Sequence, residues 1–144
     1  MILVIISSVI LLDQATKFLA IKFLQLNQPV VVFKNFLYLT LVHNRGAAFG
    51  MFQNQLLMFV LISIFAIVLI VYSLRDKRNS LIYRISLSLI LGGAIGNLID
   101  RARLGFVIDF LDFRVWPVFN LADSVITIAA VLLTWELLFK KNAA

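Results

Sequence analysis

The chain has 144 residues, of which 62% are hydrophobic and 14% charged, and its formal net charge is +6. A soluble domain carries about 25% charged residues, so this composition, with a mean hydropathy of +1.04, excludes an ordinary soluble domain and indicates a single integral membrane domain. The lack of cysteine excludes disulfides and thiolate metal sites, and with only one histidine we expect neither a metal nor a cofactor.

Four apolar segments are long enough to cross a bilayer as helices. They cover about 2–23, 56–74, 81–99 and 119–139. The second is uncharged and corresponds to roughly 28 Å of helix at 1.5 Å per residue, which matches the hydrocarbon core. The first does not resemble a cleaved signal peptide, because it lacks a basic leading region, contains Asp13 and Lys17, and precedes no small-residue cleavage site.

Four spans place both ends of the chain on one side of the membrane. The positive-inside rule assigns this side to the cytoplasm, because it also carries the basic connector at 75–78. The charge bias is small: six Lys and Arg lie on this side (75, 77, 78, 84, 140, 141) and seven on the other (17, 22, 34, 45, 101, 103, 114). We assign the basic excess to topology and to anionic membrane lipids rather than to nucleic acid.

The opposite side carries two longer connections. The first, about 25–55, contains two runs rich in β-branched and aromatic residues, which predict short strands. The second, about 102–118, is rich in the aromatic residues that favour the head-group interface. Because an uncovered sheet cannot lie in hydrocarbon, the predicted fold is an all-α integral membrane protein. It is a four-transmembrane-helix bundle with a small β-rich extracytoplasmic segment lying on the membrane surface.

Polar residues beside these spans gather toward that opposite side. They form five groups, at 13–17, 43–50, 92–101, 107–110 and 119–124. Ionisable side chains are costly at membrane depth, so those present pair, line a wet cavity or perform chemistry. Helix spacing places Asn97, Asp100 and Arg101 on one face, and Asn120 and Asp123 on another.

Several of these residues also have a structural interpretation. Asp13 and Lys17, four residues apart, predict a structural ion pair that reaches toward the interface. Asp100 and Arg101 form either a structural pair or a ligand clamp. We expect Asp112 to be a solvated loop charge.

The remaining polar residues also allow more than one interpretation. Asn120 or Asp123 could cap the last helix, His43 is a surface or packing residue, and Asn44 either caps a turn or binds substrate. The glycines at 92, 93 and 96 suit close helix packing.

Asp109 and Asp123 attract most interest because their neighbours are apolar. Two carboxylates that converge cannot easily both ionise and therefore share a proton, as in aspartic proteases. The residues alone leave two interpretations open, a catalytic pair or two separate structural carboxylates.

Together the motifs resemble the lipoprotein signal peptidase (signal peptidase II) family over nearly the whole chain. They are Asp13-Gln-x-Thr-Lys17, Val42-His-Asn-x-Gly-Ala-Ala-Phe49, Gly96-Asn-Leu-Ile-Asp-Arg101, Gly105-x-Val-x-Asp-Phe110 and Phe119-Asn-Leu-Ala-Asp-Ser124, in the family's order. Arg45 departs from the pattern, since many members carry a small polar residue there. We expect this change to affect substrate or lipid contact more than chemistry.

The resemblance implies an aspartic endopeptidase of the bacterial inner membrane. Its substrate is a diacylglyceryl-modified prolipoprotein, cut just before the lipidated cysteine. The family's catalytic pair falls on Asp109 and Asp123. Its substrate-site positions fall on Asn44, Asn97, Asp100, Arg101 and Asn120.

Other parts of the resemblance are less defined. Asp13, Lys17 and Gly46 fall on positions with a structural or uncertain role. We expect a monomer working among membrane lipids, with Phe49, Met51 and Phe52 resting on the bilayer and able to clamp the substrate.

Two other classes of function compete with a protease. A transporter or proton channel would need a polar relay that reaches both faces, whereas these residues gather at one. A non-enzymatic helical scaffold explains the glycines but not the gathered aspartates and asparagines. An intramembrane aspartyl protease of the Gly-x-Gly-Asp type is disfavoured because the motif does not occur.

Overall fold

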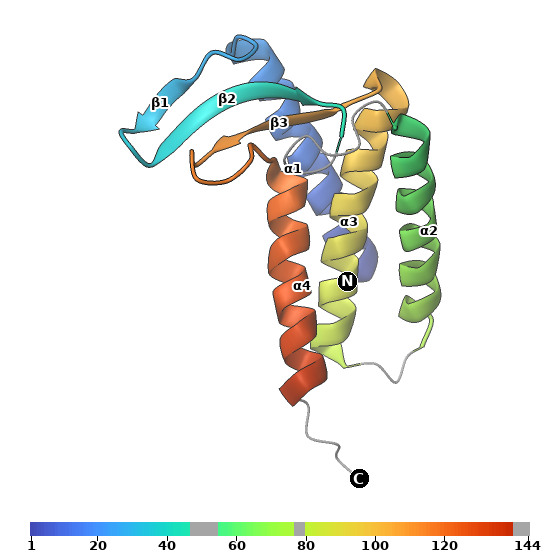
Figure 1. The fold of residues 1–144 in the computed structure, drawn as a ribbon. Coiled ribbons are helices and arrows are strands. Elements are labelled where there is room, and N and C mark those ends of the chain that lie inside the picture. The colour runs from blue at the N-terminus through green and yellow to red at the C-terminus, as the bar shows by residue number, and fades with distance from the viewer. Residues whose placement is uncertain (47–54, 77–79, 140–144) are drawn as a thin grey trace.

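The computed structural model describes residues 1–46, 55–76 and 80–139. Within them lie four helices, α1 (Ile2–Phe23), α2 (Leu56–Leu74), α3 (Leu81–Leu104) and α4 (Leu121–Phe139), and three strands, β1 (Val30–Phe33), β2 (Leu37–Asn44) and β3 (Val107–Asp112). All four helices are long and apolar enough to cross a membrane. The sheet lies across one end of the helices (Figure 1), which we call the sheet end. The predicted four-helix membrane fold with a small β segment is confirmed.

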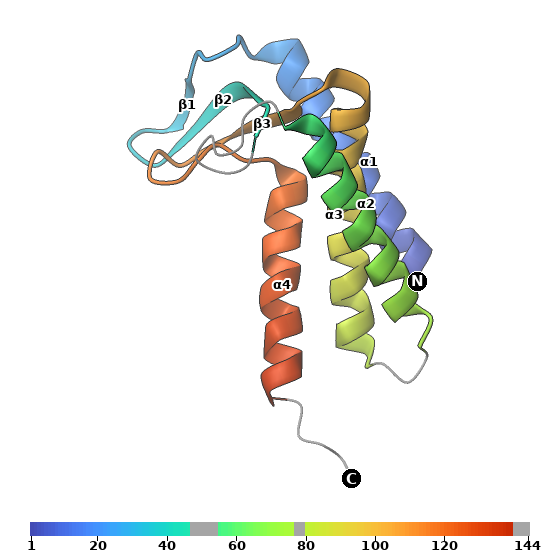
Figure 2. The same ribbon diagram turned by 45° about the vertical axis from the view of Figure 1, so that its right-hand side comes forward.

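Helix α3 is the centre of the bundle. It packs against α1 on one side and α4 on another, and α2 lies along a further side (Figure 2). Nine of its residues are buried, including Gly92, Gly93, Gly96, Asn97 and Asp100. In contrast, none of residues 56–74 in α2 is buried. The polar residues of α3 are therefore enclosed by protein, while the outer faces of the helices present apolar side chains suited to lipid.

Helices α3 and α4 differ from their expected limits at the sheet end, and α4 begins at Leu121 rather than near 119. Helix α3 continues to Leu104 rather than ending near 99, and Gly105 then stops it with a left-handed φ of 80°. Glycine adopts this conformation without steric cost, and its N–H bonds to the carbonyl of Arg101 at 3.1 Å. The extra turn keeps Asp100 and Arg101 on a regular helix, so their side chains are held at fixed directions.

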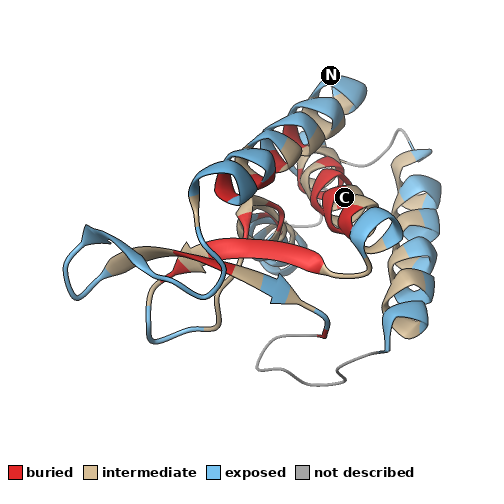
Figure 3. Ribbon diagram, turned by 90° about the horizontal axis from the view of Figure 1, so that it is seen from above, coloured by how far each residue is buried: buried red, intermediate tan, exposed pale blue. Residues whose placement is uncertain are grey.

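The sheet is antiparallel in the order β1-β2-β3. Strand β3 comes from the connection in which the sequence predicted no strand. In β3 Val107–Phe110 are all buried, as the red strand in Figure 3 shows. Its sequence, Val-Ile-Asp-Phe-Leu-Asp, shows no alternation of apolar and polar residues, and so lacks the usual signal of a half-buried strand.

The sheet is attached to the bundle by a small apolar cluster. Ala20 of α1, Leu41 of β2, and Ile108 and Phe110 of β3 form this cluster. It holds β3 over the ends of the helices, whereas the β1–β2 hairpin projects sideways (Figures 1 and 2).

Asp112 is buried, with 5% of its surface exposed, so the expectation of a solvated loop charge is wrong. It ends β3 opposite Tyr38 of β2. There its carboxylate accepts hydrogen bonds from the Thr40 hydroxyl at 2.7 Å and from the Arg114 N–H at 2.9 Å. Because β3 pairs with β2 up to this residue, the Asp112 carboxylate lies among hydrogen-bond donors rather than in a solvated loop.

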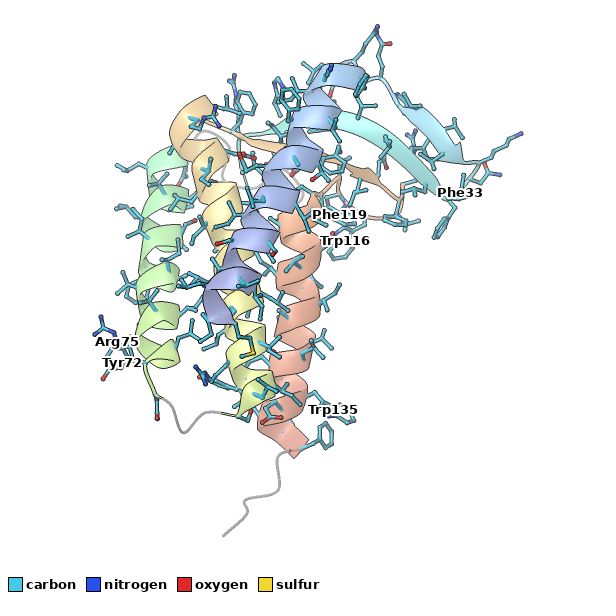
Figure 4. All side chains as sticks on the ribbon, turned by 180° about the vertical axis from the view of Figure 1, so that it is seen from behind. Phe33, Tyr72, Arg75, Trp116, Phe119 and Trp135 are labelled. Carbon is cyan, nitrogen blue, oxygen red and sulfur yellow. The ribbon has the colours of Figure 1, made fainter. Side chains whose placement is uncertain are left out.

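Exposed aromatic side chains mark both ends of the bundle. Trp116 lies near the sheet end, while Tyr72 and Trp135 lie near the opposite end (Figure 4); each is at least 60% exposed. Tryptophan and tyrosine favour the two membrane–water interfaces. Phe49, Met51 and Phe52, expected to rest on the bilayer, lie outside the described residues.

Replacing Gly93 with alanine is expected to separate α3 from α4. The added Cβ would lie 2.7 Å from Cγ1 of Ile126 and 2.8 Å from the carbonyl oxygen of Ala122, which cannot move without the helix backbone. Overpacking of this kind costs roughly 1–3 kcal/mol, more than the helix propensity that alanine adds. Thermal unfolding in detergent should show a lower midpoint for Gly93→Ala. Ala102→Ser, which also adds one heavy atom but at an exposed position of α3, should match the wild type.

Candidate active site

Asp109 lies in the middle of β3 with 1% of its surface exposed. It pairs with Val42 of β2, and Asn44 follows two residues later on that strand. The amide of Asn44 donates to Asp109 Oδ2 at 2.8 Å, and the amide of Asn120 donates to Oδ1 at 2.7 Å. Both carboxylate oxygens are thus held by neutral amides, and among the described residues no cation forms an ion pair with Asp109.

Asn44 is itself fixed by the turn that follows β2. The N–H of Gly46 donates to Asn44 Oδ1 at 3.0 Å, so the Nδ2 atom is the one turned toward Asp109. This contact gives Gly46, whose role the sequence left uncertain, a place in the site.

Asp123 lies in the first turn of α4 and forms a reciprocal cap with Asn120. The N–H of Asp123 donates to Asn120 Oδ1 at 2.9 Å, and the N–H of Asn120 donates to Asp123 Oδ2 at 3.4 Å. A side chain at the cap and an acid three residues later commonly satisfy each other's backbone donors in this way. Both residues therefore cap the helix, as one sequence interpretation held, and also contribute to the site.

Asn97 of α3 connects the two aspartates. Its Nδ2 donates to Asp123 Oδ1 at 2.8 Å, and its Oδ1 accepts from the Asn120 amide at 3.1 Å. Because that same Asn120 amide bonds Asp109, residues from α3, β3 and α4 form one hydrogen-bond network.

The two aspartates line one pocket of about 190 Å³ at the sheet end. Asn44, Asn97 and Arg101 supply the rest of its polar lining, with Gly46, Val107 and residues 116–119 as the remaining wall. The guanidinium of Arg101 lies 5.2 Å from the ring centroid of Phe59 on α2. The pocket therefore holds two acids, two amides and a cation within reach of one bound group.

The electrostatic environment of Asp109 favours its protonated form. Burial, followed by the negative charge of Asp123, raises the pKa of Asp109 to about 7, although the amides of Asn44 and Asn120 and the charge of Lys17 act the other way. Below that pH the carboxyl is neutral and can donate a proton; above it the carboxyl is ionised.

A second polar cluster lies behind the pocket, centred on Lys17 of α1. The ammonium is 2.9 Å from Asp13 Oδ2 and 2.8 Å from Asp100 Oδ2, and it donates to Asn97 Oδ1 at 2.8 Å. The expected Asp13–Lys17 ion pair is present, but these side chains are at most 3% exposed. The expectation that the pair reaches toward the interface is wrong, because α3 and α4 enclose it.

Asp100 belongs to this second cluster and does not line the pocket. Its oxygens accept from Lys17, from the Gln14 amide at 3.0 Å and from the Ile108 N–H at 3.2 Å. The sequence left a structural pair or a ligand clamp open for Asp100 and Arg101; packing separates the two side chains, since Asp100 faces α1 while Arg101 faces the pocket.

The sequence did not single out two contributors. Gln14 bridges Asp13, Asp100 and the carbonyl of Gly96, and the aromatic wall at 116–119 closes one side of the pocket. Gln14 lies inside the Asp13–Lys17 motif, and its position next to Asp13 was the one feature of the sequence that could have indicated its role.

His43 takes no part in the pocket. Its ring stacks on Phe106 with centroids 4.1 Å apart. Partial burial, followed by the positive charge of Arg45, lowers the pKa of His43, so the ring is neutral at pH 7. Within the described ranges, no group of three or more His, Cys, Asp or Glu residues could hold a metal ion.

The model of the family described as signal peptidase (SPase) II matches residues 5–139. The chain belongs to the signal peptidase II family. A lipoprotein signal peptidase of Caldanaerobacter subterraneus subsp. tengcongensis is 48% identical over 141 residues, 97% of each chain. One of Halothermothrix orenii is 44% identical over 133 residues, 92% of each chain.

The fold agrees with this membership. A solved structure of a bacterial membrane enzyme, determined by the in meso method at 2.3 Å resolution, shares 31% identity with a TM-score of 0.89, covering 99% of this chain and 93% of the other. This signal peptidase II is thus a multi-pass peptidase of the bacterial inner membrane.

The two roles of Asn120 can be separated by mutation. Serine is also a good helix cap but has no amide to donate to Asp109 and Asn97, so Asn120→Ser should keep the capping contribution to stability and lower peptidase activity. Asn120→Ala loses the cap as well and should be less stable by about 1 kcal/mol. Unfolding curves and cleavage rates of both variants check this; equal stability of the two would contradict the capping role.

Proposed function

We propose that this signal peptidase II is an aspartic endopeptidase whose catalytic pair is Asp109 and Asp123. Its substrate is a diacylglyceryl-modified prolipoprotein, from which it removes the signal peptide by cutting just before the lipidated cysteine. The observation that supports this most is the convergence of two carboxylates from different elements on one pocket, joined through Asn97 and Asn120.

The reaction needs one ionised and one protonated acid. With its pKa near 7, Asp109 carries the proton. A water molecule attacks the scissile carbonyl carbon and gives a proton to Asp123, while Asp109 donates its proton to the carbonyl oxygen. The gem-diol then collapses as Asp123 protonates the departing amine and Asp109 recovers a proton from a diol hydroxyl. Both acids return to their starting states.

The other pocket residues divide into two groups. Asn44 and Arg101 line the pocket, and Arg101 supplies guanidinium donors for substrate carbonyls. Asn97, which also lines the pocket, and Asn120, which is fully buried, hold the two carboxylates in place. Asp100 acts from behind the pocket through Lys17.

The lipid requirement has a physical explanation. An apolar groove of about 560 Å³ runs along α4, lined mainly by Phe113, Val115, Trp116, Phe119 and Ile128, and it reaches Asp123. Trp116, Phe119 and Asp123 line both this groove and the pocket. Acyl chains held there or in the adjoining bilayer would fix the neighbouring peptide bond beside the acids, so that proximity supplies part of the rate.

We propose that the sheet end faces away from the cytoplasm and that both termini are cytoplasmic. The start of α1 and the end of α4 lie away from the sheet (Figures 1 and 2). Lys17 is buried and ion-paired, so it does not count as a topology charge against this orientation. The enzyme acts as a monomer, since one chain supplies every group of the network.

Replacing either aspartate with asparagine should lower the cleavage rate by about 10²–10⁴-fold, the usual contribution of a general acid or base. A gel-shift assay in detergent would compare a diacylglyceryl-modified prolipoprotein with its unlipidated form. Wild type should cleave the lipidated form only. Asp76→Asn, at the end of α2 away from the sheet, is the matched control and should cleave like wild type.

Full activity of Asp109→Asn or Asp123→Asn would refute the catalytic pair. A well-folded wild type that cleaves neither substrate would favour the transporter or scaffold alternative.

The pH dependence should follow the protonation of Asp109. As pH rises through about 7, Asp109 ionises and the pair has no proton to give the carbonyl, so kcat/KM should fall. This decrease is the basic limb of the pH–rate profile, and its apparent pKa belongs to the coupled pair of aspartates rather than to one residue. Initial rates in micelles between pH 5 and 9 would show it; rates that rise throughout this range would contradict the assignment of Asp109 as proton donor.

A further inference from the structure

Lys17 is a buried lysine that the cleavage mechanism above does not use. Only 1% of its side chain is exposed, although it lies within the apolar helix α1. Its ammonium makes three contacts of 2.8–2.9 Å, to Asp13, Asp100 and Asn97. An ammonium has three protons, so these partners account for all of them.

The third contact fixes the direction of an amide. An ammonium can only donate, so the Asn97 atom that faces it must be Oδ1. The Nδ2 atom then faces Asp123, and it donates to that carboxylate at 2.8 Å. A reversed amide would place Nδ2 against the ammonium and turn the oxygen toward the Asp123 carboxylate, which would repel it.

The same oxygen also contacts the amide that holds the second aspartate. Asn97 Oδ1 also accepts from the amide of Asn120, whose Nδ2 donates to Asp109. The orientation set at Lys17 therefore reaches Asp123 through one amide and Asp109 through two.

We propose that Lys17 is a positioning residue for peptide cleavage, which orients Asn97 and through it presents hydrogen-bond donors to both aspartates. The proposal rests on the proposed catalytic pair. Lys17 contacts neither the pocket nor Asp123 directly, so it acts through Asn97 and through its charge.

The charges around Lys17 define how its loss should affect pH dependence. Asp13 on α1 and Asp100 on α3 contact the ammonium, Asp109 on β3 and Asp123 on α4 feel its charge, and Arg101 adds a second cation near both catalytic acids. The Lys17 charge lowers the pKa of Asp109, so removing it favours the protonated form of Asp109, and the basic limb of the pH–rate profile should move to higher pH.

The first test compares Lys17→Met with Lys22→Met. Both remove one ammonium from α1, but Lys22 is exposed and its ammonium lies 5.3 Å from the ring centroid of Phe23. Lys17→Met should lose about 10- to 100-fold in kcat, the usual cost of removing a group that orients an active-site residue. KM should change little. Lys22→Met should retain the wild-type rate and pH profile.

A double-mutant cycle with Asn97→Ala tests whether Lys17 affects cleavage through Asn97. If Lys17 acts through Asn97, Lys17→Met should cost much less in the Asn97→Ala background than in wild type. Lys17→Arg, which keeps the charge and donors, should retain more activity than Lys17→Met.

Lys17→Met removes the ammonium that contacts two buried carboxylates and therefore destabilises the fold. If Lys17→Met does not fold, the double variant Lys17→Met/Asp100→Asn, which also removes one of the two carboxylate charges, is used in its place in every measurement. A folded variant with wild-type kcat and an unmoved basic limb, or strictly additive losses in the cycle, would overturn the proposal. Asp123→Asn in the same assay separates the outcomes, because its full activity would instead refute the catalytic pair.

Discussion

The ion cluster of Asp13, Lys17 and Asp100 is the interaction on which the rest of the site depends. It ties α1 to α3, and Asp13 Oδ1 also accepts the N–H of Ala122 at 3.0 Å, which secures the first turn of α4. Removing one partner from a buried pair leaves an uncompensated charge and is strongly destabilising. Three helices therefore meet at a fixed point directly behind the pocket.

The close approach of the helices serves the same cluster. A Cβ on Gly96 would lie 2.5 Å from Asp13 Oδ2. Glycine at this position lets α1 come near enough for Asp13 and Lys17 to reach Asp100 and Asn97. The close packing of α1 on α3 and the ion pairs of Lys17 therefore depend on each other.

The two sets of aspartates differ in what neutralises them. Asp13 and Asp100 contact an ammonium, whereas both oxygens of Asp109 accept from amides and its carboxyl lies near another acid. Burial and the negative charge of Asp123 favour the protonated form of Asp109 near neutral pH. The Lys17 ammonium thus contacts the two acids of the second cluster and not the two that line the pocket.

The sequence could predict some parts of this site and not others. The helix spacing of Asn97 and Asp100 and of Asn120 and Asp123 was visible because a helix repeats every 3.6 residues. Strand β3 was not predicted because its apolar and polar residues do not alternate. Without that strand, Asp112 was assigned to a solvated loop. The division of Asp100 from Arg101 was hidden, since adjacent helix residues point in different directions and packing decides what each meets.

The sequence by itself determined the membrane class, the four spans and the family, because these depend on apolar run length and on motifs read along the chain. Only the tertiary structure decided which acids share a pocket, which acids contact the Lys17 ammonium, and which amide atom faces each carboxylate. Those properties arise from contacts between residues far apart in the chain, such as Lys17 with Asn97 and Asn120 with Asp109, and they exist only when α1, α3, β3 and α4 have packed.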